Sequence, residues 1–467
     1  MSSNASHVRN ACWHLKGVTT SSISSRFSLR SSRHWLSGFM RMPEMAPSNS
    51  KLHASTYGIT IWAVVLALVG GFSILDAEET VDWAAVIERL GQEAGSTPFD
   101  ENRRKQLAIA HNNYAIRLAE GGEFSPAEQH LQEAIRLEPA DAKFQENLAG
   151  IYLQRAQVAY QQHRMTEARE AITKALKLNS QEISAYVLLG EVEYHSQRLK
   201  EARHAWQQAI ALDPARADVT TRLEQLDQEL PVESNFERLS QAYFDIRYTE
   251  DLARSEGFDI RDDLLEARRT VGADFQFWPK HKLIVLLYQT EQFRSLRAGT
   301  PDWLAGQYDG KVRVPLPGQG LDQAGVRRTL IHEYTHAVVH DLTKGALPIW
   351  FNEGLAEYEA WKGQAPPWRT LKQAAVKEQL MPWSRLSTGF SMSLPAEEVA
   401  LAYEQSHSIV RYLVERYGFW RIRRLLKALV GGLPIEEAMT KEFRQKPARL
   451  ETEWRTWLTN LLAQSSP

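Results

Sequence analysis

Apolar residues recur every three or four positions along much of this 467-residue chain, a spacing that predicts a mainly helical protein. The pattern is clearest where Val326, Leu330, Tyr334 and Val338 follow at intervals of four and share one face of a helix over residues 323–342. Further helices are predicted over residues 262–271, 350–358, 403–418, 420–431, 435–443 and 449–462.

Short apolar runs in the same half of the chain predict β-strands. They cover residues 240–248, 282–288 and 306–316. Because the strands come first and most of the helices follow, we expect an α+β domain with a small mixed sheet. Pro315 has no N–H to donate to a ladder, which places the last run at an edge of that sheet.

The N-terminal region contains a stretch without charged residues, 54–75, of which 59–75 is nearly long enough and apolar enough to cross a bilayer. Basic residues dominate before it and acidic residues follow it. The positive-inside rule therefore predicts a cytoplasmic N-terminus and an extracytoplasmic remainder, periplasmic if the source is bacterial. We expect a single-pass signal anchor, with a signal peptide cleaved near Ala77 or a buried soluble helix as alternatives.

A sequence repeat occupies residues 102–226. Each unit carries two alanines seven residues apart, with a bulky apolar residue three positions before the first. The alanine pairs are Ala127 and Ala134, Ala168 and Ala175, and Ala202 and Ala209, and the bulky residues are Phe124, Met165 and Leu199. The second and third units are 34 residues apart and the first and second are 41 apart, which implies an extension near 154–161.

This repeat resembles a short array of tetratricopeptide repeats (TPRs). The resemblance implies an all-α solenoid of stacked helix pairs with a concave groove that binds a peptide or protein segment. The groove is expected to recruit a substrate or to join a membrane complex. A spacer that lifts the next domain off the membrane is the third interpretation.

Composition changes this picture little. With 43% hydrophobic residues, 24% charged residues and a net charge of −2, the chain is ordinary globular material without a basic stripe for nucleic acid. Its single cysteine, Cys12, precludes an internal disulfide. The expected organisation is a disordered basic segment at 1–53, a transmembrane signal anchor at 54–76, a linker at 77–101, a TPR domain at 102–230 and a catalytic domain at 231–467.

The motif His-Glu-Tyr-Thr-His at residues 332–336 carries the candidate chemistry. Residues four apart share a helix face, so His332 and His336 can direct imidazole nitrogens at one metal ion. Zinc suits such ligands, and a catalytic zinc with three protein ligands keeps a fourth position for water. Glu333 lies beside that position and is the candidate general base and acid, taking a proton from the attacking water and returning it to the leaving amine.

A third ligand is predicted seventeen residues after the second histidine, at Glu353 in the sequence Asn-Glu-Gly. With the preceding motif, this segment resembles the gluzincin metallopeptidases, the thermolysin-like and peptidase MA-like group. The resemblance covers residues 235–462. It implies that Glu353 completes a zinc site and that Glu357, one helical turn later, orients a ligating histidine. The sixteen residues between His336 and Glu353 are slightly fewer than in the best-known gluzincins.

Two other candidates for the third metal ligand fit the sequence less well. A metzincin would carry glycine and histidine three and six residues after the second histidine, where this chain has Val339 and Leu342, so that subtype is excluded. His340 lies about 6 Å farther along the helix axis than His336, which favours a capping or solvated role over metal binding.

The gluzincin resemblance also implies a hydrogen-bond donor for the developing oxyanion, commonly a tyrosine or histidine of a later helix. Tyr403 is the first candidate, and His407, on the same helix face, is the alternative. A buried tyrosine with a satisfied hydroxyl is the other interpretation of Tyr403.

The expected function is that of a membrane-anchored zinc metallopeptidase whose TPR array recruits protein partners or substrates. The edge strand around Pro315 favours a peptide substrate, because an extended peptide can add to an open sheet edge. Two alternatives stay open: a TPR scaffold with weak or absent catalysis, and a zinc hydrolase of a non-peptide amide.

Overall fold

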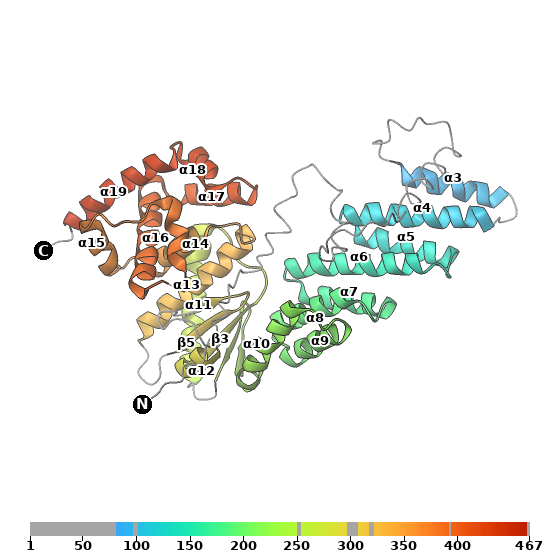
Figure 1. Ribbon diagram of the computed structural model, residues 1–467, viewed down its shortest axis with the longest axis horizontal. Coiled ribbons are helices and arrows are strands. Elements are labelled where there is room, and N and C mark those ends of the chain that lie inside the picture. The colour runs from blue at the N-terminus through green and yellow to red at the C-terminus, as the bar shows by residue number, and fades with distance from the viewer. Residues whose placement is uncertain are drawn as a thin grey trace, which may run out of the picture. The chain divides into compact units, whose positions relative to one another are not determined.

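The computed structural model describes residues 81–96, 101–249, 254–296, 307–316, 322–391 and 394–464. Within these residues the chain forms two compact units. One contains the helices before residue 186, and the other contains residues 186 onward together with His163–Met165. A helical repeat region is therefore followed by a domain of mixed sheet and helices, as the sequence predicts (Figure 1).

The first unit is built from antiparallel helix pairs. Its helices are α3 (Trp83–Ser96), α4 (Glu101–Glu120), α5 (Phe124–Leu137), α6 (Ala142–Gln161) and α7 (Met165–Leu178). In Figure 1, α4, α5 and α6 lie side by side. The alanines predicted from the repeat, Ala127, Ala134, Ala168 and Ala175, are all fully buried, because a methyl group lets paired helices approach closely.

The turns of the repeats share one backbone feature. Two residues after the ends of α4, α6 and α8 (Ile183–His195), the chain adopts a positive φ: 80° at Gly122, 56° at His163 and 55° at Gln197. A left-handed residue just past a helix end reverses the chain and satisfies the last carbonyl groups. The third repeat continues with α9 (Leu199–Leu212) and α10 (Ala217–Glu233), and α10 runs on through Pro231.

The second unit contains a five-stranded sheet in the order β1-β2-β3-β5-β4. Its strands are β1 (Glu237–Ser240), β2 (Phe244–Tyr248), β3 (Leu283–Gln289), β4 (Gln307–Tyr308) and β5 (Val312–Leu316). β2, β3 and β5 are parallel, and β1 and β4 pair antiparallel at the two ends. Two of the three segments predicted as single strands each contain two antiparallel strands instead, because turns at residues 241–243 and 309–311 divide them.

The strand that contains Pro315 is next to the edge and not at it. β4 pairs with β5 only at Val312 and Arg313. Pro315 lies beyond this pairing, opposite Tyr288 in the parallel ladder with β3. The predicted edge position is therefore occupied by β4, and β5 lies one strand in from the edge.

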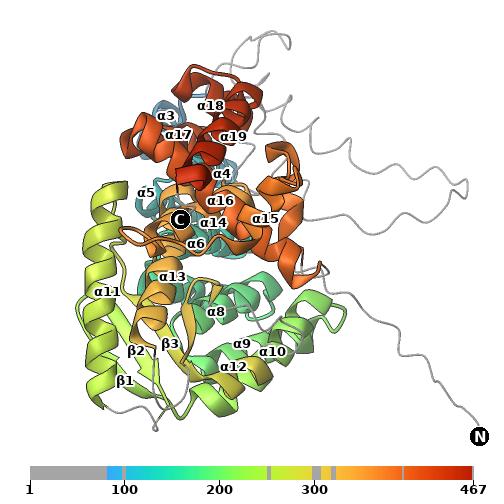
Figure 2. The same ribbon diagram turned by 90° about the vertical axis from the view of Figure 1, so that its left-hand side faces the viewer.

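Both faces of the sheet are covered, which explains the unbroken apolar run of β3. Val285 and Leu287 point into the large core beneath α11 (Arg254–Phe275) and α13 (Gln323–Thr343). Leu286 and Tyr288 point to the opposite face, against α12 (Thr290–Leu296) and the end of α10. Figure 2 shows α11 and the α10–α12 pair on opposite sides of the strands.

The helices after the sheet complete the same core. They are α14 (Ile349–Ala360), α15 (Arg369–Val376), the 3-10 helix η1 (Trp383–Phe390), α16 (Ala396–Tyr417), α17 (Phe419–Val430), α18 (Ile435–Phe443) and α19 (Pro447–Gln464). The long α16 packs against α14, α15, η1, α17 and α19. It therefore connects α14 with the C-terminal helices, whose predicted ranges are close to those found.

A buried polar network joins the third repeat to the sheet. Arg313 of β5 donates to Glu233 of α10 at 2.6 Å and to the Tyr194 hydroxyl of α8 at 2.8 Å. Tyr288 of β3 donates to the same Glu233 carboxylate at 2.6 Å. This network explains why the third repeat shares a compact unit with the sheet, whereas the sequence predicted a boundary after residue 230.

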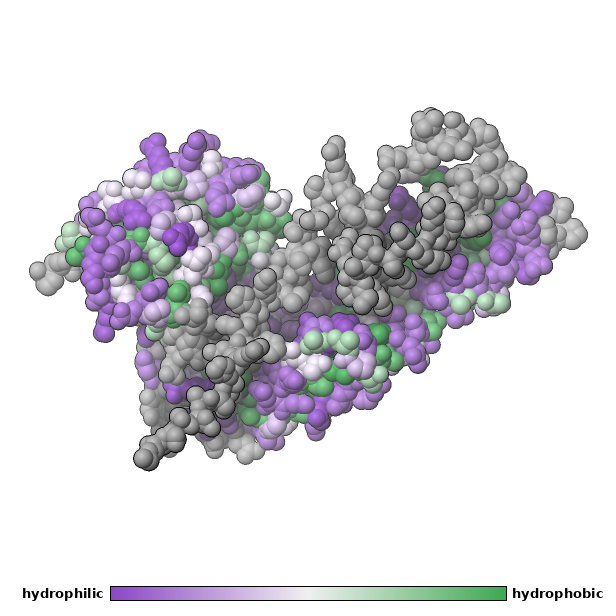
Figure 3. Space-filling model, viewed as in Figure 1, coloured by the Kyte–Doolittle hydropathy of each residue, from purple (hydrophilic) through white to green (hydrophobic). Residues whose placement is uncertain are grey.

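The prediction of localisation needs correction. Across the part of the chain that the structure describes, each helix is either too short or too polar to cross a membrane. The predicted anchor at 54–76 and the predicted disordered segment at 1–53 lie outside the described residues, and the stretch predicted as a linker contains α3. On the surface seen in Figure 3, hydrophilic and apolar residues are intermixed. The single-pass, extracytoplasmic assignment is therefore withdrawn.

Candidate metal centre

The predicted metal ligands lie on two consecutive helices. His332 and His336 are one turn apart on α13, and Glu353 lies on α14. Lys344, which has a φ of 54°, and Gly345, which has a φ of 76°, end α13 and reverse the chain. The short connection lets α14 pack directly against α13, so the sixteen-residue separation noted in the sequence is sufficient.

The three side chains converge on one point. His332 Nε2 and His336 Nε2 are 3.0 Å apart, and each lies 3.3 Å from Glu353 Oε2. Donor atoms that share a tetrahedral zinc at about 2.0–2.1 Å are roughly 3.3 Å apart. The donor set therefore has the spacing of a metal site before any ion is added.

Unsatisfied buried atoms support the same fit. Among the described residues, Oε2 of Glu353 and Oε2 of Glu333 are buried without a hydrogen-bond partner. A buried carboxylate oxygen without a partner is costly, and a cation at this point would satisfy it. Two imidazoles and one carboxylate are a donor set that suits zinc.

The electrostatics of the site follow from burial and proximity. Burial alone would raise the pKa of Glu353, but the adjacent imidazoles of His336 and His332 hold it well below its usual range. Burial raises the pKa of Glu333, against the opposing effect of the two histidines. The two glutamates thus differ in character: Glu353 stays ionised more readily, and Glu333 holds a proton more readily.

Glu357 lies one turn after Glu353 and contacts the first histidine from behind. Its Oε1 is 3.1 Å from His332 Nδ1. A carboxylate at Nδ1 fixes the tautomer in which Nε2 carries a lone pair and faces the ion. The structure thus brings Glu357 into contact with His332.

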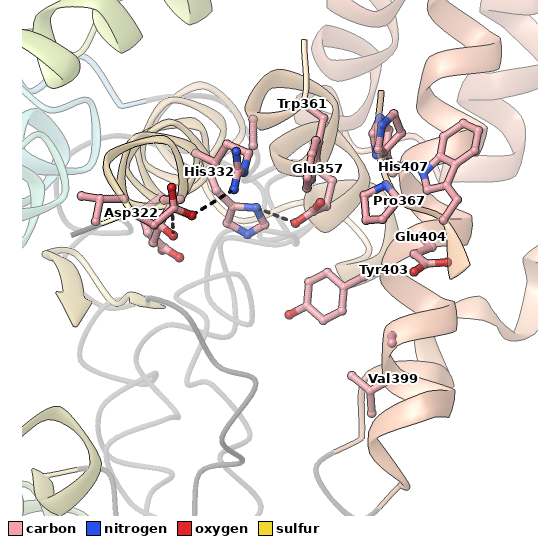
Figure 4. Close-up of a pocket in the computed structure, with 18 of the residues that line it drawn as sticks. Asp322, His332, Glu357, Trp361, Pro367, Val399, Tyr403, Glu404 and His407 are labelled. Atoms are coloured by element: carbon pink, nitrogen blue, oxygen red, sulfur yellow. Dashed lines mark hydrogen bonds and ion pairs between the residues drawn. The ribbon is translucent and has the colours of Figure 1, made fainter. Parts of the chain in front are cut away.

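A pocket of about 600 Å³ opens over the metal centre (Figure 4). His332, Glu333 and Glu357 line its floor, and Tyr403 of α16 lines the opposite wall. In Figure 4 the Tyr403 hydroxyl points into the pocket, toward the side that carries His332 and Glu357. Burial, with the charges of the nearby glutamates, raises the pKa of Tyr403, so its hydroxyl keeps its proton for donation.

His407 lies one turn farther along α16. In Figure 4, Glu357 lies between His332 and His407. Trp368 donates its indole N–H to His407 Nδ1 at 3.4 Å, and burial lowers the pKa of His407 to about 4. The imidazole is therefore neutral with its proton on Nε2. This N–H is the second hydrogen-bond donor that α16 contributes to the pocket lining, beside Tyr403.

Among the pocket residues that were not singled out in the sequence are Arg328, Trp361 and Trp368. Arg328 is one helical turn before His332, so the helix face that predicted the ligands also contains it. The two tryptophans lie in the segment between α14 and α15, where the chain path follows no periodic pattern. Trp368 has a φ of 39°, a left-handed conformation that nothing in the local sequence predicts.

His340 belongs to a different environment. Its side chain is 44% exposed and its Nδ1 lies 3.8 Å from Asp341. The ring packs edge-on against Tyr308, with 5.7 Å between centroids. The structure thus places it with these residues, apart from the metal ligands.

A second group of possible ligands, His163, His281 and Asp341, lies in the same compact unit. The nearest imidazole nitrogens are 3.1 Å and 3.4 Å from the carboxylate oxygens of Asp341. Here the two rings are stacked at 3.8 Å with planes 12° apart, so their lone pairs lie in nearly parallel planes and do not converge. The ring planes of His332 and His336 are 81° apart, which suits a shared ion. We therefore place the candidate metal centre at the latter pair.

Two parts of the chain match known protein families. A family model described as Peptidase MA superfamily matches residues 318–460, and one described as Tetratricopeptide repeat matches residues 153–217. No curated protein matches the chain.

Three solved structures are similar to part of the chain. The Arabidopsis OM64 TPR domain is 21% identical, with a TM-score of 0.20, over 26% of this chain and 96% of that one. The first TPR domain of the human RPAP3 protein is 20% identical, with a TM-score of 0.21, over 27% and 95%. MamA is 16% identical, with a TM-score of 0.22, over 35% and 89%. The chain therefore combines tetratricopeptide repeats with a Peptidase MA superfamily domain.

Proposed function

We propose that this protein is a zinc-dependent metallopeptidase. The observation that carries the proposal is the convergence of His332, His336 and Glu353 at the spacing of donor atoms around one cation. Its location inside a Peptidase MA superfamily domain supports a hydrolytic role. When bound there, zinc would polarise a carbonyl group and make a water molecule more acidic.

Glu333 is the proton carrier of the proposed reaction. It shares the pocket floor with His332, and its unsatisfied Oε2 is available to accept a proton from the attacking water. The same carboxyl group then donates that proton to the nitrogen of the departing amine. Glu357 takes no part in bond breaking; it keeps His332 in the tautomer that binds metal.

Tyr403 is the proposed donor to the developing oxyanion. Its hydroxyl points into the pocket from the wall opposite the metal ligands (Figure 4). A donor that is already in place when negative charge develops lowers the barrier without further reorganisation.

The outer side of β5 favours a peptide substrate. Pro315 lines the same pocket, and the strand beyond Arg313 has no described partner on its outer side. An extended peptide can bond to the main chain of such a strand and pass over the metal centre. The TPR array supports a macromolecular substrate or partner, because stacked repeats bind protein segments.

The test uses the full-length chain, expressed with zinc and compared with Glu333→Gln. We expect one zinc per chain, cleavage of unfolded casein, loss of cleavage on chelation and recovery when zinc is restored. Glu333→Gln should retain zinc but lose at least about 10²-fold in kcat. Glu398→Gln, a substitution at an exposed position of α16, is the matched control and should behave as the unaltered chain.

The outcomes separate the competing functions. Cleavage that survives chelation or persists in Glu333→Gln would exclude the proposed chemistry. Zinc binding with no cleavage of peptides, but with turnover of simple acyl amides, would indicate a non-peptide amidase. Failure to bind zinc would favour a repeat scaffold without catalysis.

A further inference from the structure

One charge of the pocket is not used by the proposed chemistry. Among the described residues that line the pocket, Arg328 is the only arginine or lysine. Two of the four acidic side chains that line the pocket are engaged elsewhere: Glu357 contacts His332, and Glu404 accepts a hydrogen bond from the backbone N–H of Leu371 at 2.7 Å. Arg328 is therefore the cation that an incoming anionic group meets.

Its place on the helix fixes its distance from the chemistry. Arg328 lies four residues before His332 on α13, on the face that carries the ligands. Four residues of α-helix advance by about 6 Å, whereas an extended peptide advances by roughly 3.3–3.6 Å per residue. A group bound by Arg328 would belong to a residue one or two positions from the scissile bond.

The guanidinium is held in place but not saturated. It stacks on the ring of Trp361, with 4.7 Å from its central carbon to the ring centroid. Its ion pair with Asp322 Oδ2 spans 3.7 Å, longer than a hydrogen bond, and the Asp322 side chain is 70% exposed. A planar fork that is oriented by an indole and paired only loosely is suited to bidentate binding of a carboxylate.

Apolar side chains line much of the pocket. Trp361 stacks on the guanidinium, and Trp368, Pro367 and, on α16, Val399 also line the pocket (Figure 4). Lower water access strengthens an ion pair formed inside such a wall. The neighbouring substrate side chain is accordingly expected to be apolar or aromatic.

We propose that Arg328 binds a carboxylate of the substrate, close to the scissile bond. This inference rests on the proposed peptidase function and specifies its substrate class. The carboxylate belongs either to an acidic side chain or to the C-terminus of the peptide. The first source gives an acid-selective endopeptidase, and the second gives a carboxypeptidase-like enzyme.

Three probes distinguish these sources: acetyl-Ala-Phe-Ala as the free acid, the same peptide amidated, and amidated acetyl-Ala-Phe-Glu. Binding is measured by calorimetry on zinc-loaded full-length protein that carries Glu333→Gln, so that no turnover occurs. We expect one acidic probe or both to bind at least about tenfold more tightly than the neutral amide. Arg328→Gln should make the acidic probes and the neutral amide bind almost equally tightly. Arg328→Lys should retain part of the preference for the acidic probes.

Arg327→Gln is the matched control. Arg327 is the neighbouring residue, but it lies near Asp263 and Glu266 of α11, at 3.7 Å and 4.0 Å, outside the pocket lining. The Arg327→Gln substitution removes the same charge from the same helix turn. The ratio of the affinities for the acidic probes and the neutral amide should therefore stay as in the parent protein.

Equal binding of the three probes, binding of none at millimolar concentration, or an unchanged ratio in folded Arg328→Gln would each overturn this inference. Its failure is separable from that of the proposed function. A protein that cleaves casein without acid preference refutes the Arg328 site alone. A protein that prefers the acidic probes but cleaves nothing refutes the peptidase and keeps the carboxylate site.

Discussion

Gly354 of α14 lies directly against the backbone carbonyl of Ser406 in α16. A Cβ on Gly354 would be 2.7 Å from that oxygen and 2.8 Å from a methyl group of Val410. A Cβ carbon does not approach a carbonyl oxygen this closely, so only glycine permits the contact. The contact draws α16 against the helix that carries Glu353 and thereby brings Tyr403 over the metal centre.

Gly354→Ala is expected to push α16 away from α14. Overpacking of this kind costs about 1–3 kcal/mol, which exceeds the gain of up to about 1 kcal/mol from replacing a helical glycine. We expect a lower Tm and, because Tyr403 moves with α16, a lower kcat at nearly unchanged zinc content. Thermal unfolding, casein cleavage and metal analysis measure the three effects.

Gly150→Ala is the control for helix propensity. Gly150 lies within α6 and has no atom within 4 Å of an added Cβ, so this substitution should raise the Tm or leave it unchanged. If Gly354→Ala were equally harmless, the close packing of α14 on α16 would not be what positions Tyr403.

Glu357→Gln is expected to weaken zinc binding without unfolding the protein. The amide keeps the size of the side chain but loses the charge that holds His332 Nδ1–H at 3.1 Å. Loss of such a partner typically lowers metal affinity or activity by about 10- to 100-fold. Competition with a fluorescent zinc chelator measures the change. An affinity equal to that of the unaltered protein would show that Glu357 is only a neighbour of the histidine.

The placement of the candidate ligands on shared helix faces is predictable because this geometry is local. His332 and His336 are fixed by one helical turn, and Glu357 follows Glu353 by another, so spacing alone places each pair on a face. The contact between the two pairs depends on how α14 returns after Gly345. The sequence indicated this return through the family resemblance and through Gly345, a residue that favours a turn.

The remaining pocket depends on long-range packing that periodicity does not record. Trp361 and Trp368 reach the site through an irregular segment, and α16 reaches it through the glycine contact. The third repeat joins the sheet through the ion pair of Arg313 and Glu233. In the sequence, Arg313 is simply a basic residue of a strand and Glu233 an acidic residue of a helix. Pairing across that distance in the chain leaves no local signal.

Tyr403→Phe tests the oxyanion donor. Removing one preorganised donor lowers kcat by about 10²–10³-fold, and we expect KM and zinc content to change little. His407→Gln keeps a hydrogen-bonding side chain and should have a smaller effect on kcat, because His407 lies behind Glu357 in Figure 4. A larger loss in His407→Gln than in Tyr403→Phe would reverse the assignment of the two residues.

Lys311 provides a test of stability against pH. It is fully buried, its ammonium nitrogen has no hydrogen-bond partner among the described residues, and it lies 3.6 Å from the ring centroid of Tyr194. Burial, reinforced by the charge of Arg313, lowers the pKa of Lys311 from 10.5 to about 8, against the attraction of Glu233 and other acids. The folded state therefore binds this proton less tightly than the unfolded chain does.

The depressed pKa of Lys311 makes the stability of the folded protein depend on pH. Below pH 8 both states carry the proton and the folded protein bears the full cost of the buried charge. Between pH 8 and 10.5 the unfolded chain holds more protons, so rising pH removes that cost. Lys311→Met keeps the length of the side chain without the charge, and it should raise the Tm at pH 7 by roughly 2–4 °C. This gain should shrink when unfolding is measured at pH 9 and again at pH 10. A gain that is independent of pH, or a loss of stability at pH 7, would mean that the ring of Tyr194 and the nearby acids compensate the charge in full.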